Sequence, residues 1–169
     1  KKKIRSLADA YAEQCFNEQL KIGKISTSSN WKFSEALVPG APGAPIAGSL
    51  YEREGSMNNF EQRSIMELSS LPNVLFWHRN LGRGKGFSIN GFKSNHYPDF
   101  ILCTKSGKVV MVETKGDDRD NSDSEAKCRL GNQWAQQSGN GYNYFMVFES
   151  NSIEGAYNLN KAKELISKL

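Results

Sequence analysis

The sequence predicts an α/β fold in which a mixed central sheet is flanked by helices. Three observations support this class. After about residue 51, segments with helix and strand patterns follow in the order helix, three strands, helix, strand, helix. Only Lys105-Ser106-Gly107 separates the second and third strands, which predicts an antiparallel hairpin. The last strand, 142–148, is apolar and aromatic on both faces, as is typical of a strand covered on both sides.

The composition is that of an ordinary globular domain. The chain has 169 residues, of which 38% are apolar and 24% charged, and its formal net charge is +4. This length predicts one domain, or one domain plus an extension. No apolar run approaches the roughly 20 residues that cross a bilayer, so no membrane association is expected. Three scattered cysteines predict neither a disulfide framework nor a zinc site, which favours the cytoplasm.

The first fifty residues differ from the rest. Apolar residues between positions 4 and 20 recur at the spacing of an amphipathic helix, whose stripe needs a partner to cover it. Pro39, Pro42 and Pro45 exclude regular structure from 38–49, which predicts a linker or an extended strap. We therefore expect residues 1–50 to be a helix and a Pro/Gly-rich extension that joins an upstream region, and residues 51–169 to be the compact domain.

Capping and breaking residues predict the elements of the compact domain. Asn58 or Asn59 caps a helix that Pro72 ends near residue 70, and a strand follows at 74–78. The Gly- and Asn-rich segment 80–95 predicts a hairpin with a mobile loop at its tip. The later elements are strands at 97–104, 108–115 and 142–148, a helix from a capping box at 122–125 to about 137, and a helix at 159–169.

The hairpin between the second and third strands brings two acids together if its turn has three residues. Gly107 supplies the left-handed residue that such a turn requires at its end. Thr104 then lies opposite Lys108, and the same register places Asp99 opposite Glu113 with Cβ atoms roughly 5 Å apart. A two-residue turn would put the two acids on opposite faces.

Facing carboxylates repel each other unless a cation lies between them. Their hard oxygens, with room for water, suit Mg²⁺, for which Mn²⁺ can substitute. Lys115 follows on the same face and can orient a water or stabilise a developing negative phosphate charge. Glu61 lies on the apolar stripe of the preceding helix and is expected as a ligand at one remove. Hydrolysis of a phosphodiester is therefore predicted, with Asp99, Glu113, Lys115 and Glu61 as the catalytic residues and the three acids as metal ligands.

These residues resemble a known family. Pro98-Asp99, a hydrophobic hairpin and Glu113-Thr114-Lys115 are similar to the signature of the PD-(D/E)XK nucleases, and the helix with Glu61 is similar to the acidic first helix of that fold. More narrowly, the segments 59–61, 97–102 and 112–116 resemble the C-terminal endonuclease domain of type III restriction enzymes, in the Res subunit. The resemblance covers about residues 51–148.

The resemblance implies a restriction-endonuclease-like αβββαβ core and Mg²⁺-dependent cleavage of double-stranded DNA in the bacterial cytosol. It also implies a helicase motor, whose ATP site lies in a region that this chain does not contain, and a methyltransferase subunit that recognises the DNA site. Asp99, Glu113 and Lys115 carry over as the catalytic trio and Glu61 as the helix acid. Lys127 carries over as a basic residue near the site.

A basic stretch precedes the first catalytic acid. Residues 68–98 contain no Asp or Glu but include Arg79, Arg83, Lys85 and Lys93. We expect these four residues and Lys127 to bind DNA, because Arg and Lys contacts to phosphates position a duplex. A flexible, solvated tip at 82–86 explains the same composition nearly as well.

The sequence leaves two alternative functions open. The chain can be another nuclease of the same fold, acting in repair or on branched DNA. It can also be a non-catalytic DNA-binding or docking module that merely keeps the fold. For the hairpin itself, the alternative is a surface hairpin in which Asp99 and Glu113 are solvated or paired with Lys115 and Lys108. No Walker motif, spaced zinc ligands or Gly-x-Ser-x-Gly elbow occurs in the chain.

Overall fold

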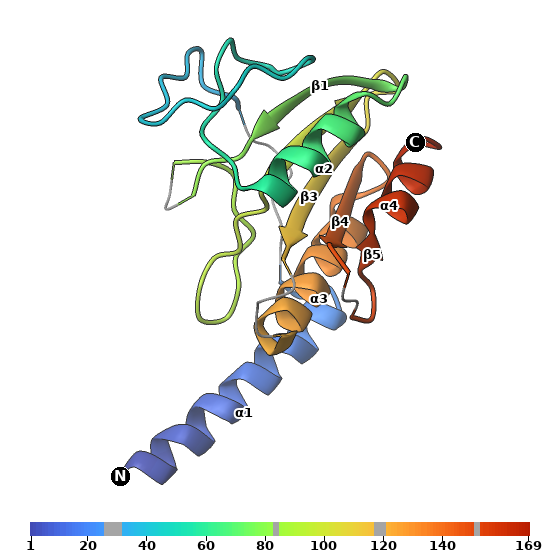
Figure 1. Ribbon diagram of the computed structural model, residues 1–169. Coiled ribbons are helices and arrows are strands. Elements are labelled where there is room, and N and C mark those ends of the chain that lie inside the picture. Colours follow the sequence, from blue (N-terminus) through green and yellow to red (C-terminus); the bar gives the residue numbers. More distant parts are fainter. Residues whose placement is uncertain (26–31, 83–84, 117–120, 151–152) are drawn as a thin grey trace.

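The structure is a computed structural model that describes residues 1–25, 32–82, 85–116, 121–150 and 153–169 (Figure 1). Its elements are α1 (Lys2–Lys21), α2 (Asn59–Ser69), β1 (Val74–Arg79), β2 (Phe100–Thr104), β3 (Val109–Lys115), α3 (Asn121–Ser138), β4 (Tyr142–Phe148), β5 (Tyr157–Asn158) and α4 (Leu159–Ile166). The α/β class is confirmed.

The five strands form one mixed sheet in the order β1-β2-β3-β4-β5. The pairs β1–β2 and β2–β3 are antiparallel, whereas β3–β4 and β4–β5 are parallel. From α2 to β4 the elements follow the predicted order of helix, three strands, helix and strand. The two-residue strand β5 was not predicted.

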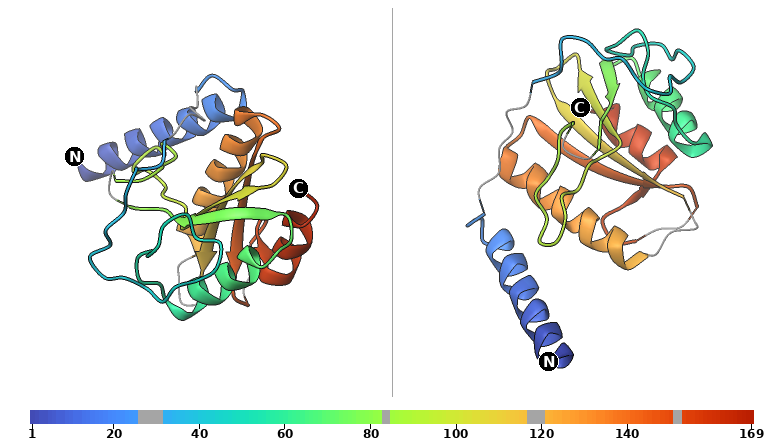
Figure 2. Two further views of the ribbon diagram at one scale, coloured as in Figure 1. Left: turned by 90° about the horizontal axis from the view of Figure 1, so that it is seen from above. Right: turned by 90° about the vertical axis from the view of Figure 1, so that its left-hand side faces the viewer.

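Helices cover both faces of the sheet (Figures 1 and 2). α2 and α4 pack on one face, where Val110 and Val112 of β3 join the larger apolar core. α3 packs on the other face, where Met111 joins the second core with Trp134 of α3. Because side chains alternate along a strand, the positions that follow Met111 in the same phase, Glu113 and Lys115, belong to the α3 face.

Local signals account for the elements next to the predicted site. The Asn58 side chain accepts a hydrogen bond from the Glu61 N–H at 2.8 Å, and the Glu61 carboxylate accepts one from the Asn58 N–H at 2.9 Å. This reciprocal capping box begins α2. Gly107 has a φ of +82° in the turn after β2, as the three-residue turn requires.

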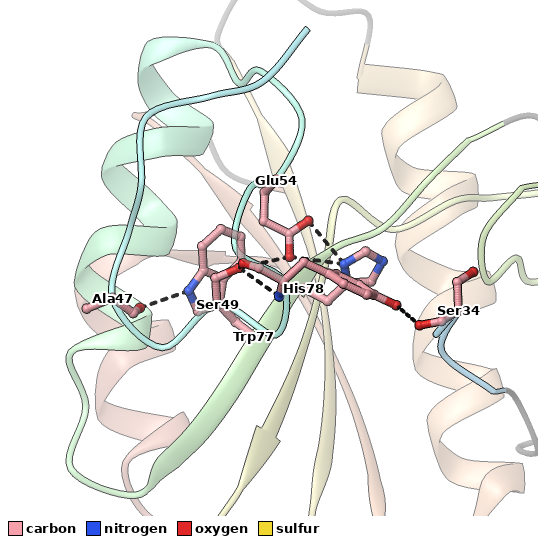
Figure 3. Close-up of polar contacts among 7 residues, drawn as sticks. Ser34, Ala47, Ser49, Glu54, Trp77 and His78 are labelled. Carbon is pink, nitrogen blue, oxygen red and sulfur yellow. Dashed lines mark hydrogen bonds and ion pairs between the residues drawn. The ribbon is translucent and has the colours of Figure 1, made fainter. Parts of the chain in front are cut away.

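The segment before α2 lies along the edge of the sheet at β1 (Figure 3). The Trp77 N–H donates to Gly48 O at 2.9 Å, and the Leu50 N–H donates to Trp77 O at 2.7 Å. The Trp77 indole Nε1 donates to Ala47 O at 3.0 Å. The two backbone bonds satisfy the N–H and C=O of Trp77, on an edge strand that would otherwise be open to pairing with another chain.

A buried hydrogen-bonded pair of side chains attaches this same segment to β1. His78 Nδ1 lies 3.1 Å from both carboxylate oxygens of Glu54, and both side chains are only 3% exposed. The Ser49 hydroxyl donates to Glu54 Oε1 at 3.0 Å (Figure 3). The strap predicted at 38–49 therefore contacts the sheet directly, while the boundary expected near residue 51 stays a prediction.

Two local expectations differ from the structure. The described residues between β1 and β2 form no strand; Ile89 and His96 make one isolated antiparallel bridge in place of the predicted hairpin. Asn80 holds this loop, because its side chain bonds Phe87 and Pro98. α3 begins at Asn121, so the predicted cap, Ser122, lies inside the helix. The helix expected near the start of the chain forms as α1, and none of the described residues covers the start of its apolar stripe: Ile4, Leu7 and Tyr11 are 73%, 65% and 71% exposed.

None of the helices among the described residues combines the length and the apolar character that crossing a membrane requires.

Candidate active site

The β2–β3 register places the two predicted catalytic acids opposite each other. Phe100 pairs with Val112 and Leu102 with Val110, and one step further along the same register Asp99 faces Glu113. The register follows from the three-residue turn, since Thr104 N donates to Lys108 O at 2.9 Å. The predicted alignment of these strands is therefore confirmed.

Asp99 sits just before β2 and is held by one residue of β3. Its carboxylate oxygen Oδ2 accepts a hydrogen bond from the Thr114 backbone N–H at 2.7 Å and another from the Thr114 hydroxyl at 2.7 Å. The Asp99 side chain is half-buried and largely surrounded by other protein atoms. Burial raises the pKa of Asp99; the bonds from Thr114 oppose this, and the nearby Glu61 adds to it.

Glu113 and Lys115 form a buried pair on the α3 face of β3. Lys115 Nζ lies 2.5 Å from Glu113 Oε1, and the two side chains are 10% and 6% exposed. The other carboxylate oxygen, Oε2, is buried and has no hydrogen-bond partner among the described residues. Burial, followed by the charge of Asp99, raises the pKa of Glu113 to about 8, although Lys115 opposes the shift.

The Asp99–Glu113 pair fits a divalent cation with oxygen ligands. A cation would supply the missing partner of Glu113 Oε2. It would also offset the burial and the negative charge of Asp99, which raise the pKa of Glu113. No group of three or more His, Cys, Asp or Glu side chains in the described part of the chain is placed to hold a metal. Mg²⁺ tolerates such a site, because it commonly binds through one or two carboxylates and keeps several waters.

Glu61 lies close enough to Asp99 to influence its charge, but its own carboxylate is already bound. Oε2 accepts hydrogen bonds from the Asn58 N–H and, at 3.1 Å, from Arg79 Nη1. The structure therefore does not join Glu61 to Asp99 and Glu113 in a three-acid group. The physical reason is its position, because α2 covers the face of the sheet opposite to α3. Its place as a ligand at one remove stays a prediction.

The predicted DNA-binding cations are dispersed, and several have acidic partners. Arg79 is bound to Glu61, Lys93 lies 3.5 Å from Glu13, and Lys127 lies 2.5 Å from Asp123. Lys85 is exposed, and Arg83 lies outside the described residues. Lys127 is nevertheless near the site, since its charge acts on Glu113 and on His96. Lys93 and Lys127 both line a cavity of about 160 Å³ between α1 and α3.

Sequence reasoning did not predict the layer behind the site. The His96 ring Nε2 lies 2.8 Å from the Tyr144 hydroxyl of β4, and both side chains are buried. Burial, with Lys127 and Lys115 nearby, lowers the pKa of His96 to about 3, so the ring is neutral. A Cβ at Gly131 of α3 would lie only 2.4 Å from the Tyr144 ring, so a glycine is required there. No local pattern links residues 48 positions apart.

Sequence reasoning also assigned no role to Thr114. Strict alternation assigns it to the face opposite to Glu113 and Lys115, so nothing in the pattern connects it to Asp99. The connection arises because Asp99 lies beyond the last paired residue of β2 and its side chain turns toward the Thr114 backbone.

Comparisons with known proteins add nothing to this geometry: no family model, no curated protein and no solved structure matches the chain.

Proposed function

We propose that the chain is a Mg²⁺-dependent DNA endonuclease domain with a PD-(D/E)XK arrangement of Asp99, Glu113 and Lys115. One observation carries the proposal. The β2–β3 register, extended by one residue, sets Asp99 opposite Glu113, and the charge of Asp99 acts on Glu113. Lys115 pairs with Glu113, whose other buried carboxylate oxygen has no partner among the described residues. If the Lys115–Glu113 pair were only structural, the protein would gain nothing from placing a second acid, Asp99, beside it or from burying Glu113 Oε2 without a partner.

The chain's own residues would perform distinct tasks. Asp99 and Glu113 would hold Mg²⁺, which when bound supplies a positive charge that stabilises the phosphate and its leaving oxygen. Lys115 would orient the attacking water and offset the charge that develops on the phosphate, since its ammonium lies at Glu113. Lys127 would add positive potential for the incoming DNA strand.

The finer assignment rests on the sequence resemblance and on the order of the elements. The succession of helix, three strands, helix and strand from α2 to β4 is that of the αβββαβ core. On this proposal the chain is the cleavage domain of a type III restriction enzyme, with double-stranded DNA as substrate. A helicase motor and a methyltransferase subunit would then be its partners, and ATP would act only through the motor.

The non-catalytic alternative also has an observation in its favour. Lys115 is paired with Glu113, as a hairpin without catalytic function would have it, although Lys108 donates to Asn140 O at 2.5 Å instead. A DNA-binding or docking module would bind DNA without metal, and Asp99→Ala would leave this binding unchanged.

A plasmid-nicking assay tests the proposal. Supercoiled plasmid is incubated with the 169-residue chain and Mg²⁺, and the loss of the supercoiled form is followed on a gel. We expect Asp99→Ala to reduce nicking to the background of plasmid alone, and Lys115→Ala to slow it by about 100-fold or more. EDTA should abolish the activity, and Mn²⁺ should restore it.

Matched variants separate the site from the rest of the surface. Lys108→Ala, just before β3 at the end far from the site, and Glu125→Ala, an exposed acid on α3, should retain wild-type nicking. Equal nicking by Asp99→Ala and wild type would assign any activity to a contaminant. Metal-independent DNA binding together with no measurable Mg²⁺ affinity in calorimetry would favour the docking module.

A further inference from the structure

In each of the two carboxylates, Asp99 and Glu113, one oxygen makes the contacts described above and the other takes no part in them. Glu113 uses Oε1 to bind Lys115, and its Oε2 is left without a partner in the described part of the chain. Asp99 uses Oδ2 to accept both hydrogen bonds from Thr114, and Oδ1 takes no part in them. The partners, Thr114 and Lys115, are consecutive residues of β3.

Thr114 restrains Asp99 more tightly than one hydrogen bond could. Its backbone N–H and its hydroxyl both reach the same oxygen at 2.7 Å. Two donors from one residue define a direction for the carboxylate, whereas a single bond would allow the group to rotate. Asp99 precedes β2 and lacks the β2–β3 pairing that holds the residues after it, while its carbonyl accepts a hydrogen bond from the Asn80 N–H at 2.8 Å. The bonds from Thr114 therefore provide its link to β3.

We propose that Thr114 is a positioning residue, which fixes the Asp99 carboxylate so that its second oxygen is presented to a divalent cation shared with Glu113. This inference rests on the proposed function. It assigns Thr114 no contact with the metal or the DNA, and its effect passes through Asp99. Outer-shell partners of this kind typically change metal affinity by about 10- to 100-fold when they are lost.

The side chain chosen at this position has a physical logic. The hydroxyl donates to Asp99, and the β-branched methyl suits a strand residue that is only 8% exposed. Valine has nearly the same shape but no donor. Thr114→Val therefore removes one of the two bonds to Oδ2 and leaves the backbone bond in place.

Calorimetric titration of the metal-free chain with Mg²⁺ tests this role without relying on cleavage. We expect Thr114→Val to weaken Mg²⁺ binding by about tenfold, and Thr114→Ser, which keeps the hydroxyl, to stay within about twofold of wild type. If the valine variant does not fold, as judged by thermal unfolding, Thr114→Ala provides the same loss of the donor.

Thr104→Val is the matched control. Thr104 is a buried threonine at the far end of the same hairpin, and its hydroxyl bonds Ser106 Oγ at 2.8 Å and the Lys108 N–H at 2.9 Å. The control should lower the melting temperature but keep the wild-type Mg²⁺ affinity. A general loss of strand stability would weaken both variants alike and would overturn the positioning role.

The outcomes distinguish this inference from the proposed function. Equal Mg²⁺ affinity of wild type and Thr114→Val, or failure of Thr114→Ser to retain affinity, overturns the role of Thr114 alone. Absence of Mg²⁺ binding by the wild-type chain overturns the proposed function and this inference with it.

Discussion

At the scale of single residues, the charged forms of Asp99 and Glu113 are unfavourable in the metal-free site. Asp99 and Glu113 face each other in a setting where burial already disfavours their charged forms. Lys115 offsets part of this penalty but reaches only one oxygen of Glu113. The free energy of unfolding of the metal-free protein should therefore depend on pH in a specific direction.

The pKa of Glu113 is about 8 in the folded chain and 4.5 in the unfolded chain. The folded state therefore holds the proton more tightly, and the stability that results is present below pH 4.5 and is lost as the pH rises to about 8. His96 acts in the opposite sense, because its folded pKa of about 3 lies below 6.5, and its contribution is complete near pH 6.5. We expect unfolding free energies, measured with denaturant in EDTA, to fall between pH 6.5 and pH 8.5.

The slope attributable to one group cannot exceed about 1.4 kcal/mol per pH unit. Glu113→Gln should make the fall smaller, since glutamine resembles the protonated acid, whereas Glu125→Gln on the exposed side of α3 should leave it unchanged. An unfolding free energy that rises from pH 6.5 to pH 8.5 would contradict a raised pKa of Glu113 in the folded state.

At the scale of elements, the start of α2 links helix stability to the surroundings of the site. Asn58 and Glu61 cap each other, and Glu61 also binds Arg79 at the end of β1. The acid predicted as a metal ligand is thus first a capping residue and an ion-pair partner. Although Glu61 has these two structural roles, its negative charge still raises the pKa of its neighbour Asp99.

Asn58→Ala should cost about 1 kcal/mol of unfolding free energy, because it leaves the Glu61 N–H without its acceptor. Asn59→Ala is the matched control; this exposed neighbour is the first helical residue, and its substitution should change stability by less than about 0.5 kcal/mol. Chemical denaturation of the two variants checks the difference. Equal losses would contradict the assignment of Asn58 as the cap.

At the scale of the whole molecule, residues outside the expected compact domain complete the sheet edge. Residues 47–50 bond Trp77 of β1, and Ser49 contacts the buried Glu54–His78 pair. Residues 1–12, at the start of the chain, are all exposed. The extension therefore contains one part that supports the domain and one that does not.

Two truncations test this division. Removal of residues 1–12 should change the unfolding free energy by less than about 0.5 kcal/mol, because no described side chain there is buried. Removal of residues 1–50 should cost about 3 kcal/mol or more, since it deletes three hydrogen bonds to Trp77 at about 1 kcal/mol each and the buried Leu20. Equal stability of the 51–169 chain and the full chain would contradict a structural role for the strap.

Short-range patterns were sufficient for the elements and for the central alignment of the site. Alternation, the Asn58 cap and the glycine at position 107 act over a few residues, and together they predicted β2, β3 and the opposition of Asp99 and Glu113. A turn of fixed length transmits its register along both strands, so one local feature decided a contact between residues 14 positions apart.

The contacts that surround this pair required the folded chain. Thr114 reaches Asp99 only because the ladder ends at Phe100, and His96 meets Tyr144 only because β4 packs beside β3 beneath α3. The attachment of the strap to β1 depends in the same way on which segment covers the sheet edge. Periodicity encodes which face a residue occupies, whereas packing between distant segments determines which side chains share that face.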